Sequence, residues 1–335
     1  RDKLVTGVQT CALPILLDKT INDGLAGKRI RTTIDKKTQQ FATTVATKYA
    51  RYYSGNYINN VAVLVTDTRT GEILAYVGNA EIQGKETAQY VDNVVSLRSS
   101  GSILKPFLYA AMLNEGALLP NSLVADIPTR FGSYAPENFE RTYQGAVPAS
   151  EALAHSLNIP AVRELEQFGQ IRFHVFLQQL GFTSITRPAS YYGLSLILGG
   201  AEVSLYEITS MYASMGRSLL SYIRNFGKYE TDDYHKAYYI PFNQPVEKHF
   251  SNHSILDAGS IWYTLEALST VNRPWAETGW EYFASTHKIA WKTGTSFGSR
   301  DAWSVGVTPQ YTVGVWVGNS TGEGRPGLTG VTHAA

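Results

Sequence analysis

The sequence predicts an α+β protein whose antiparallel sheet is assembled from both ends of the chain. Strand-like segments rich in Val, Ile, Leu and Tyr occur at residues 60–79 and again between 287 and 319. Between them, residues 120–216 mostly show apolar positions three and four apart, which is the spacing of helices. A chain of 335 residues that is 44% hydrophobic can easily bury the core that such a fold requires.

The first predicted elements are a helix and a β-hairpin. A short extended piece leads to Asp35, a suitable N-cap for an amphipathic helix in which Phe41, Val45 and Tyr49 recur every four residues. Residues 60–79 then contain two apolar runs separated by a polar Asp-Thr-Arg-Thr-Gly segment, which predicts two strands joined by a turn.

The central part of the chain is predicted to be helical and the last part to form strands. A helix is predicted to start near Pro106, because proline is tolerated only at a helix start, and to stop at Gly116. Further helices follow up to a stop at Gly216, and the Tyr-rich residues 218–252 are predicted to wrap the surface. The remaining predicted elements are a helix at 254–271, a strand at 287–296, and two strands at 301–319 joined at Pro309 and Gln310.

Composition excludes several classes of function. The 29 basic and 28 acidic side chains give a net charge of +1, and no Lys/Arg run occurs, so no nucleic-acid partner is predicted. No stretch of about 18 apolar residues is present, so the sequence predicts no membrane-spanning helix within it. The chain has seven histidines, from which we predict no metal hydrolase, and we predict no cofactor.

The first 15 residues do not have the pattern of a signal peptide. The run Val5–Ile15 can be back-translated into codons that match a common sequencing adapter read in frame. We therefore interpret residues 1–15 as non-native, predict that they make no core contacts, and treat 16–28 as a linker remnant. Cys11, the only cysteine, belongs to this segment, so the rest of the chain needs no thiols, which suits an oxidising compartment.

A first chemical motif is Ser102-x-x-Lys105. On a helix these positions lie on one face, about one turn apart, so a hydroxyl and an amine can meet. Because Ser102 precedes a helix start, the positive end of the helix dipole would stabilise a developing oxyanion there. The spacing arises by chance about once in such a chain. Indeed a second copy, Ser285-x-x-Lys288, enters a predicted strand, where the two side chains would point apart.

Two further motifs follow in order. Ser156-Leu157-Asn158 supplies a hydroxyl and an amide, although it also fits a helix cap, just as Ser54-Gly55-Asn56 fits a turn before the hairpin. The four residues Lys292-Thr293-Gly294-Thr295 are more specific, because a fixed four-residue match arises in only about one such chain in a hundred. A glycine beside a lysine on an edge strand favours pairing with an extended ligand and binding of its carboxylate.

Together, SILK, SLN and KTGT resemble the signatures of the penicillin-interacting active-site serine enzymes, which comprise penicillin-binding proteins and serine β-lactamases. The surrounding segments RSSGSILKPFLYAAML, YAPENF, ALAHSLNIPAV and KTGTSFGSRDAWSVGVTPQYTVGVWVGN are similar to the transpeptidase domain of bifunctional class A penicillin-binding proteins, the 1C type in particular. The resemblance spans residues 29–335. It implies a five-stranded antiparallel sheet flanked by helices and an all-helical lobe, at about 117–217, that carries SLN.

The resemblance also implies parts that this sequence does not contain. These are an N-terminal membrane anchor, a glycosyltransferase domain, and a C-terminal continuation that includes a helix packed on the sheet. We therefore expect the domain to be C-terminally truncated, so that the last strand leaves an apolar face without its covering helix. The implied location is the periplasmic face of the bacterial inner membrane, with membrane attachment only through the absent anchor.

The function implied by the resemblance is a serine D,D-transpeptidase that cross-links peptidoglycan stem peptides ending in D-Ala-D-Ala and is acylated by β-lactams. For the chemical step, the resemblance implies Ser102 as the nucleophile, Lys105 as its base, Ser156 as a proton relay and Lys292 as electrostatic support. For substrate binding, it implies Asn158 as a ligand of the peptide amide, and Thr293 and Thr295 as ligands of the terminal carboxylate on the strand opened by Gly294. The N–H groups of Ser102 and Thr295 are implied to form the oxyanion hole. The pKa of Lys105 must then fall from about 10.4 to near 7, which burial and a second cation both favour.

Two alternatives remain open on the sequence alone. A serine β-lactamase needs a base that activates water, and we assign the acids Glu164 and Glu166 to the surface of an amphipathic helix rather than to that role. A β-lactam sensor or other non-catalytic binding module would keep Ser102 reactive without turnover.

Overall fold

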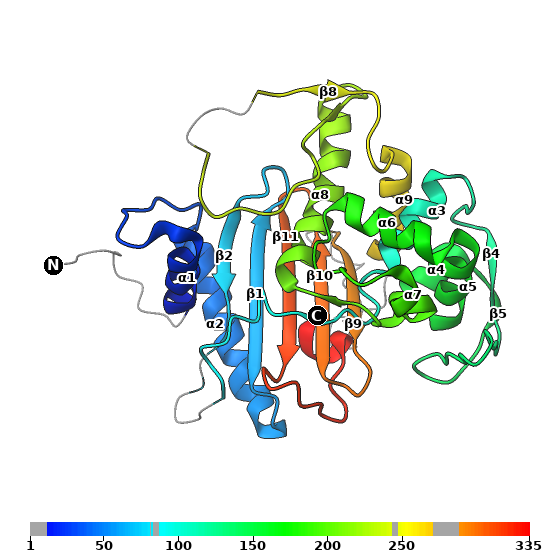
Figure 1. Cartoon of the computed structure of the whole chain (residues 1–335), viewed down its shortest axis with the longest axis horizontal. Coiled ribbons are helices and arrows are strands. Elements are labelled where there is room, and N and C mark those ends of the chain that lie inside the picture. Colours follow the sequence, from blue (N-terminus) through cyan, green and yellow to red (C-terminus); the bar gives the residue numbers. More distant parts are fainter. Residues whose placement is uncertain (1–11, 81, 83–86, 243–246, 271–287) are drawn as a thin grey trace.

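The sheet has five antiparallel strands in the order β2-β1-β11-β10-β9 (Figure 1). The computed structural model describes residues 12–80, 82, 87–242, 247–270 and 288–335. Its sheet strands are β1 (Asn60–Asp67), β2 (Ile73–Val77), β9 (Ala290–Thr295), β10 (Asp301–Val307) and β11 (Tyr311–Gly318). Because β1 pairs with β11 along its whole length, the early hairpin and the last strands form one sheet, as predicted from the sequence.

Helices cover both faces of this sheet (Figure 1). One face is packed by α2, against β1 and β2, and the other by α8, against β1, β10 and β11. The helices are α1 (Ala12–Thr20), α2 (Lys36–Tyr53), α3 (Lys105–Asn114), α4 (Ala149–Ala154), α5 (Asn158–Phe168), α6 (Gln170–Leu180), α7 (Ala189–Tyr192), α8 (Leu205–Arg224) and α9 (Ala258–Ser269), with short turns η1 (Ile21–Leu25), η2 (Ser54–Asn56), η3 (Gly193–Leu198) and η6 (Gly330–Ala334).

The helical lobe, formed by α4 to α7, also contains a two-stranded ribbon. The three small ribbons of the described residues pair β3 (Arg98–Ser99) with β6 (Glu202–Val203), β4 (Leu123–Asp126) with β5 (Gly145–Pro148), and β7 (Tyr229–Glu230) with β8 (Phe250–Ser251). The ribbon β4–β5 lies at the outer side of the lobe, beside α4 and α5 (Figure 1). The loop between β4 and β5 becomes important for the site described below.

Helix α8 does not stop at Gly216, so that part of the sequence prediction is wrong. The helix continues to Arg224. A Cβ on Gly216 would lie 2.7 Å from Cγ2 of Thr68 and 3.1 Å from Cγ1 of Val307. Glycine therefore serves here for close packing of the helix on the sheet, and the roughly 1 kcal/mol that it costs a helix interior is offset by that contact.

Helix α2 begins after Asp35 as predicted, but it buries a different face from the one expected. The Asp35 side chain accepts a hydrogen bond from the backbone N–H of Thr38. Phe41, which the sequence pattern placed on the apolar face, is 73% exposed, whereas Ala42 and Ala46 are buried against the sheet. Small alanine side chains let the helix approach β1 and β2 closely. The larger side chains of Phe41, Val45 and Tyr49 therefore lie beside this contact rather than in it.

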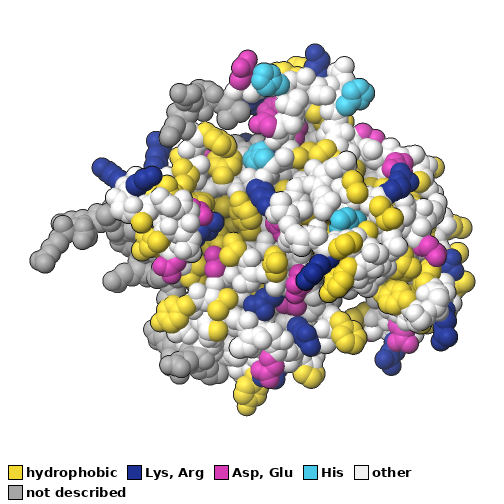
Figure 2. Space-filling model, viewed as in Figure 1, with side chains coloured by type: hydrophobic (Ala, Val, Ile, Leu, Met, Phe, Trp, Pro, Cys, Tyr) yellow, Lys and Arg dark blue, Asp and Glu magenta, His cyan; other side chains and the backbone are white. Residues whose placement is uncertain are grey.

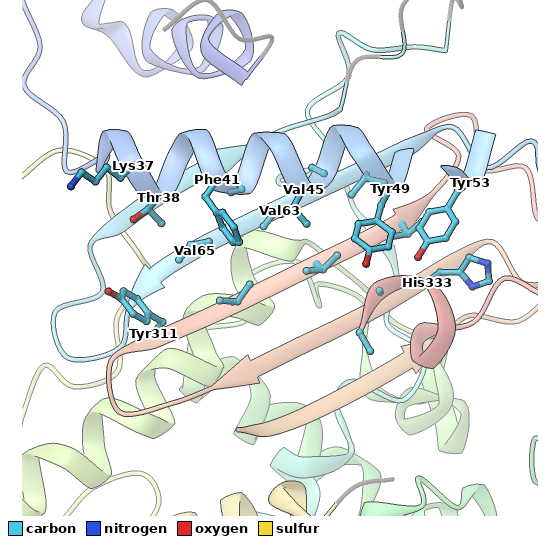
Figure 3. A pocket seen from close by; sticks show the side chains of 18 residues that line it. Lys37, Thr38, Phe41, Val45, Tyr49, Tyr53, Val63, Val65, Tyr311 and His333 are labelled. Atoms are coloured by element: carbon cyan, nitrogen blue, oxygen red, sulfur yellow. The ribbon is translucent and has the colours of Figure 1, made fainter. Parts of the chain in front are cut away.

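Those larger side chains line an open apolar groove between α2, β11 and η6 (Figure 3). The groove has a volume of about 650 Å³, and Phe41, Val45 and Tyr49 of α2 line it together with Val313 and Val315 of β11. Val313 and Val315 are only half-buried. An uncovered apolar face on the last strand was expected from the sequence, and this groove lies on that strand.

Ile15 contacts the core, contrary to the prediction that residues 1–15 make no core contacts. Ile15 and Leu16 of α1 are buried within the main core cluster. A Cβ on Gly78 would lie 2.6 Å from Cγ2 of Ile15, so the helix packs directly after the end of β2. The apolar spacing of this segment therefore makes a packed helix, whatever the origin of its codons; residues 1–11 lie outside the described residues.

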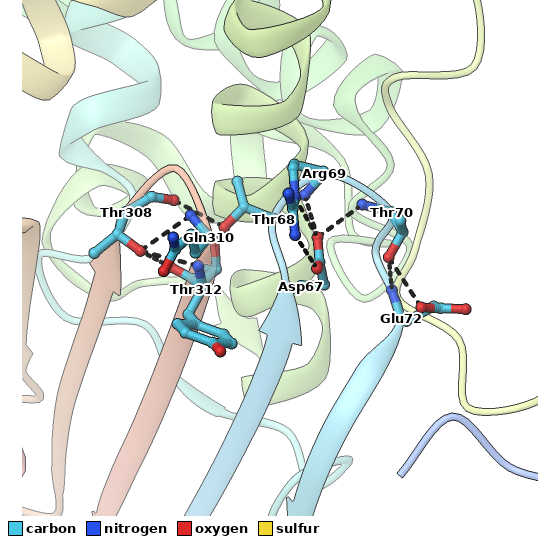
Figure 4. A network of polar contacts seen from close by, with 9 residues as sticks. Asp67, Thr68, Arg69, Thr70, Glu72, Thr308, Gln310 and Thr312 are labelled. Atoms are coloured by element: carbon cyan, nitrogen blue, oxygen red, sulfur yellow. Dashed lines mark hydrogen bonds and ion pairs between the residues drawn. The ribbon is translucent and has the colours of Figure 1, made fainter. Parts of the chain in front are cut away.

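Two turns at one end of the sheet are tied together by threonines (Figure 4). The Thr68 hydroxyl lies 2.9 Å from that of Thr312, and it donates to the Thr308 carbonyl at 3.0 Å. The Thr68 N–H donates to the Gln310 carbonyl at 3.0 Å. Next to them, the Asp67 carboxylate accepts the N–H groups of the β1–β2 turn. The two hairpins that come from opposite ends of the chain are thus fixed in register.

The surface carries interspersed charges of both signs on the face viewed in Figure 2. Such mixing agrees with the near-neutral composition. Among the described residues, no helix combines the length and the apolar character that crossing a bilayer requires.

Candidate active site

Ser102 lies in a tight turn immediately before helix α3. The turn is closed by bonds from the Ile103 N–H to the Ser100 carbonyl and from the Lys105 N–H to the Ser102 carbonyl. Helix α3 begins at Lys105, so Ser102 is beside a helix N-terminus as the sequence predicts. Its hydroxyl makes no hydrogen bond within the part of the chain that the structure describes. Of the second Ser-x-x-Lys copy, only Lys288 lies within the described residues.

Lys105 is buried and bonded to the second motif. Its Nζ donates to the carbonyl oxygens of Ser156 (2.7 Å) and Leu157 (3.1 Å) and to Oδ1 of Asn158 (2.7 Å). The sequence spacing predicted that this amine could touch Ser102, but no hydrogen bond joins the two side chains. The lysine therefore connects the helix that follows the serine to the Ser156–Asn158 turn.

Lys292 reaches the same turn from the sheet. Its Nζ donates to the Ser156 hydroxyl at 2.8 Å and to its neighbour's carbonyl, that of Thr293, at 2.6 Å. The Ser156 hydroxyl also lies 3.5 Å from Nζ of Lys105. Two buried amines from different elements thus converge on one hydroxyl. Ser156 holds this position with a left-handed backbone, φ 56°, which is uncommon for a residue with a Cβ.

The electrostatics of this cluster lower the pKa values of both amines. Burial, reinforced by the charge of Lys292, holds the pKa of Lys105 well below its usual range, while Glu164 acts in the opposite direction. Burial alone lowers the pKa of the Lys292 amine to about 7. A lysine that loses its proton near neutral pH can accept one from a nearby hydroxyl, which an exposed lysine cannot do.

The sheet side of the site consists of backbone packed against backbone. A Cβ on Gly101 would lie 2.7 Å from the Thr295 carbonyl oxygen, and one on Gly294 would lie 3.4 Å from the Ser102 nitrogen. Because the Ser296 N–H donates to Asp301 of β10, the strand alternation directs the N–H of Thr295 away from β10, toward the open edge of β9. The N–H groups of Ser102 and Thr295 therefore belong to two backbone segments in direct contact.

The threonines of the third motif are half-buried at this edge. Thr293 and Thr295 both belong to β9, an edge strand of the sheet. Among the described residues, β9 pairs with β10 on one side and has no sheet neighbour on the other. The Thr295 hydroxyl accepts a hydrogen bond from the Gly330 N–H at 3.0 Å. An open strand edge with flanking hydroxyl groups is the geometry that pairs with an extended peptide.

Glu164 was wrongly assigned to the surface. It is only 9% exposed on α5, and burial raises its pKa to about 8, with Lys105 acting in the opposite direction. Glu166 is exposed, as predicted. The spacing Ala161, Glu164, Phe168 does place this acid on the apolar stripe of the helix, so the signal was present in the sequence.

Asn138 and Asp126 were not singled out from the sequence, although Asn138 lies within the YAPENF segment. The Asn138 side chain accepts hydrogen bonds from two backbone N–H groups at the start of α5, and Asp126 accepts one from Asn138. No motif in the sequence links a residue at 126 to one at 158, because only the folded ribbon β4–β5 brings them together. By contrast, Ser54-Gly55-Asn56 forms the short turn η2, as the simpler interpretation predicted.

Comparison with known proteins gives one family. Residues 61–327 match the family model described as the penicillin binding protein transpeptidase domain. Penicillin-binding protein 1C of Escherichia coli is 33% identical over 276 residues, which cover 82% of this chain and 33% of that protein. Penicillin-binding protein 1B of Haemophilus influenzae is 27% identical over 332 residues, which cover 92% of this chain and 39% of that protein. The chain thus spans between a third and two fifths of the length of these relatives.

Solved structures agree in fold. The PonA1 protein from Mycobacterium tuberculosis, in complex with penicillin V, superposes with a TM-score of 0.68 at 20% identity, covering 96% of this chain and 87% of that one. Penicillin-binding protein 1A from Haemophilus influenzae gives a TM-score of 0.61 at 23% identity, covering 81% of this chain and 45% of that one. With the fold, the motifs and the family model in agreement, this chain belongs to the penicillin-binding protein transpeptidase domain family.

Proposed function

We propose that this domain is a serine D,D-transpeptidase, which cross-links peptidoglycan stem peptides through an acyl-enzyme on Ser102 and is acylated by β-lactams at the same hydroxyl. One observation carries the proposal: two buried lysines, one from each flanking motif, converge on the Ser156 hydroxyl at 3.5 and 2.8 Å. A structural lysine is normally solvated at the surface, so two buried ones around one hydroxyl point to proton transfer.

The proposed acylation step uses the groups as follows. The Ser102 oxygen attacks the carbonyl carbon of the penultimate D-alanine, and its proton passes to the neutral amine of Lys105. The N–H groups of Ser102 and Thr295 stabilise the resulting oxyanion. When the intermediate collapses, the carbon–nitrogen bond breaks, and the departing D-alanine nitrogen takes a proton from the Ser156 hydroxyl, which the lysines replenish. An amine of a second stem peptide then displaces Ser102 from the ester.

Substrate binding is proposed for the edge of β9 and for Asn158. The stem peptide would lie along this edge, with its terminal carboxylate bonded to the hydroxyls of Thr293 and Thr295 and with the absence of a side chain at Gly294 leaving room for it. Lys292 would add positive charge near the carboxylate. Asn158 would bind the peptide amide with its side chain, after giving up part of its present contact with Lys105.

Lys105 must change its contacts to act as the base. Its three oxygen acceptors satisfy all three N–H bonds of an ammonium group, whereas a neutral amine has two N–H bonds and one lone pair. Deprotonation therefore frees one position of the nitrogen to face Ser102. The low pKa that burial imposes makes this step feasible near neutral pH.

The proposed substrate fixes where the domain would act. Peptidoglycan lies outside the cytoplasmic membrane, so we place the domain on the periplasmic face of the bacterial inner membrane. In the longer protein we expect a glycosyltransferase domain and an N-terminal anchor, as in the bifunctional class A type that the sequence resembles.

Labelling with a fluorescent penicillin tests the proposal. The parent chain should form a stable ester, and Ser102→Ala should abolish it. Lys105→Arg should lower the acylation rate constant by about 10²- to 10⁴-fold, because a guanidinium cannot act as a neutral base at pH 7. Lys288→Arg, at the second copy of the motif, serves as the control and should leave the rate unchanged.

Three results would overturn specific parts of this proposal. Labelling of a folded Lys105→Arg variant within threefold of the parent would remove Lys105 as the base. Rapid hydrolysis of the penicilloyl ester would assign the domain to the β-lactamases instead. Stable acylation without release of D-alanine from a pentapeptide would indicate a β-lactam sensor.

A further inference from the structure

Besides the two lysines, a side chain from outside the three motifs holds the turn that carries the second motif. Helix α5 begins at Asn158, and the cap position before it is Leu157, whose side chain cannot accept a hydrogen bond. Oδ1 of Asn138 accepts the N–H of Asn158 at 2.8 Å and that of Ile159 at 3.3 Å. The first donors of the helix are thus satisfied by a residue 20 positions away in the sequence.

Asn138 is in turn oriented by a buried acid. Its Nδ2 donates to Oδ1 of Asp126 at 2.7 Å and to the Thr142 carbonyl at 2.9 Å. The other carboxylate oxygen of Asp126 accepts the Gln144 N–H at 2.9 Å. Because the carboxylate is an acceptor only, it allows only one orientation of the Asn138 amide, with nitrogen toward Asp126 and oxygen toward α5.

Burial separates this pair from ordinary loop contacts. Asp126 is 0% exposed and Asn138 5% exposed. Among residues 127–144, which form an otherwise open loop, only Pro136 and Asn138 are buried. No ion pair to Asp126 occurs among the described residues, and a buried acid of this kind destabilises a fold unless its hydrogen bonds are retained.

The contacts lead directly to the reacting groups. Asn158 is held on three sides: its N–H by Asn138, its Nδ2 by the Glu137 carbonyl at 2.8 Å, and its Oδ1 by the amine of Lys105 at 2.7 Å. The adjoining Ser156 has a left-handed backbone that costs about 1–2 kcal/mol and persists only where surrounding contacts impose it. Asn138 supplies such contacts on the C-terminal side of this turn, at the N–H groups of Asn158 and Ile159.

We propose that Asn138, oriented by Asp126, is a positioning residue that holds the Ser156–Asn158 turn and thereby places the Lys105 amine and the Ser156 hydroxyl for acylation. This inference rests on the proposed function. It goes beyond the three motifs, because neither residue belongs to them and neither is a hydrogen-bond partner of the Lys105 amine, which bonds to Ser156, Leu157 and Asn158.

A matched pair of substitutions tests the inference on the whole chain. Asp233, at 3% exposure, resembles Asp126 in its contacts: it accepts a side-chain hydrogen bond of 2.7 Å from Ser221 and a backbone N–H from Glu230 at 3.2 Å, but at the β7–β8 ribbon. Asp126→Ala should lower the penicillin acylation rate constant by about 10- to 100-fold, as a small misplacement of reacting groups does. Asp233→Ala should lower the melting temperature at least as much yet retain the parental rate.

A double-mutant cycle separates positioning from general stability. If Asn138 acts through Asn158, then Asn138→Ala should cost less than threefold in acylation rate once Asn158→Ala is present, although it costs about 10-fold or more alone. Full additivity of the two substitutions would overturn the inference. So would equal acylation defects in the Asp126→Ala and Asp233→Ala variants.

Hydrogen exchange supplies a readout that does not depend on acylation. In Asn138→Ala, peptides that contain the amides of Asn158 and Ile159 should exchange about 10-fold faster, because two hydrogen bonds are lost, whereas Asp233→Ala should leave them unchanged. Unchanged exchange in Asn138→Ala would overturn the positioning role. If the parent chain itself is not acylated, the proposed function fails, and the exchange result still decides whether Asn138 holds the turn.

Discussion

The two walls of the candidate site are held by different kinds of interaction. On the sheet wall, β9 is fixed by its ladder with β10, and its glycine lets the turn before α3 pack backbone against backbone. On the helical wall, the Ser156–Asn158 turn is fixed by three side chains: Asn138 accepts a hydrogen bond from its backbone, and Lys105 and Lys292 donate hydrogen bonds to it. The sheet wall therefore depends on glycines that have no Cβ atom, whereas the helical wall depends on side chains that donate and accept hydrogen bonds.

This difference predicts two modes of failure. Adding a methyl group to the sheet wall forces backbone segments apart, and a backbone cannot yield as a flexible side chain does. Removing a donor or acceptor from the helical wall adds no atoms that must be accommodated, so we expect the fold to persist and the reacting groups to be displaced only slightly. Substitutions on the sheet wall should therefore act almost as all-or-none changes, and those on the helical wall should act in graded steps.

The largest effect is expected for Gly101→Ala on the sheet wall. Gly101 has φ 51°, and its added Cβ would lie 2.7 Å from the Thr295 carbonyl oxygen. Gly116→Ala is the matched control, because Gly116 has φ 67° but no atom within 4 Å of its Cβ position, so only the backbone strain is added. We expect penicillin labelling to fall by about 10³-fold or more in the first variant and by less than threefold in the second. Equal labelling of the two variants would show that crowding at β9 has no role.

An intermediate effect is expected for Lys292→Met, where the two walls meet. Without this cation the pKa of Lys105 should rise, because the charge of Lys292 is one of the two causes that lower it. The acid limb of the pH profile of acylation should therefore move to higher pH by about one unit, and the rate at pH 7 should fall about 10- to 100-fold. A rate loss with an unmoved acid limb would assign Lys292 to ligand binding alone.

The smallest effect on activity is expected for Glu164→Gln behind the helical wall. Because its pKa is about 8, this acid is mostly protonated at pH 7, and glutamine resembles that form. Acylation at pH 7 should stay within about threefold of the parent. Above pH 8 the parent ionises Glu164, which raises the pKa of Lys105, so the variant should then be the faster of the two.

The same variant changes stability in a pH-dependent way. A folded-state pKa raised from 4.5 to about 8 means that the folded protein binds this proton more tightly than the unfolded chain. That contribution is fully present below about pH 4.5 and is lost as the pH rises through 8. Relative to the parent, Glu164→Gln should gain roughly 2–5 kcal/mol in the free energy of unfolding between pH 5 and pH 8. A gain that does not depend on pH, measured by denaturant unfolding, would contradict the buried proton.

The sheet wall could be predicted from the sequence because its information is local. The hairpins β1–β2 and β10–β11 follow from alternating apolar residues and short polar turns, and the sequence Lys292 to Thr295 contains the lysine, the threonines and the glycine in consecutive positions. The order of the three motifs then indicated the family, which the family model confirmed.

The helical wall could be predicted only in part, because its information is spread over the chain. Asn158 was identified, but its partner Asn138 and the anchor Asp126 come from a ribbon whose pairing no local pattern reveals. Glu164 was placed on the surface because charged residues usually lie there, although its helical spacing put it on the buried stripe. The same reliance on general preference misjudged Phe41, which lies beside the open groove rather than in the core.

The left-handed backbone of Ser156 has a consequence for how such a domain would evolve after losing its activity. Glycine adopts this backbone without strain and asparagine with less than serine, so either would stabilise the folded domain at this position. Serine is the costlier choice, and the proposed use of its hydroxyl in proton transfer would offset that cost. In a copy of the gene released from selection for catalysis, this codon should be among the first to drift toward glycine or asparagine. The residue type found at position 156 should therefore indicate whether a related domain still uses the serine hydroxyl.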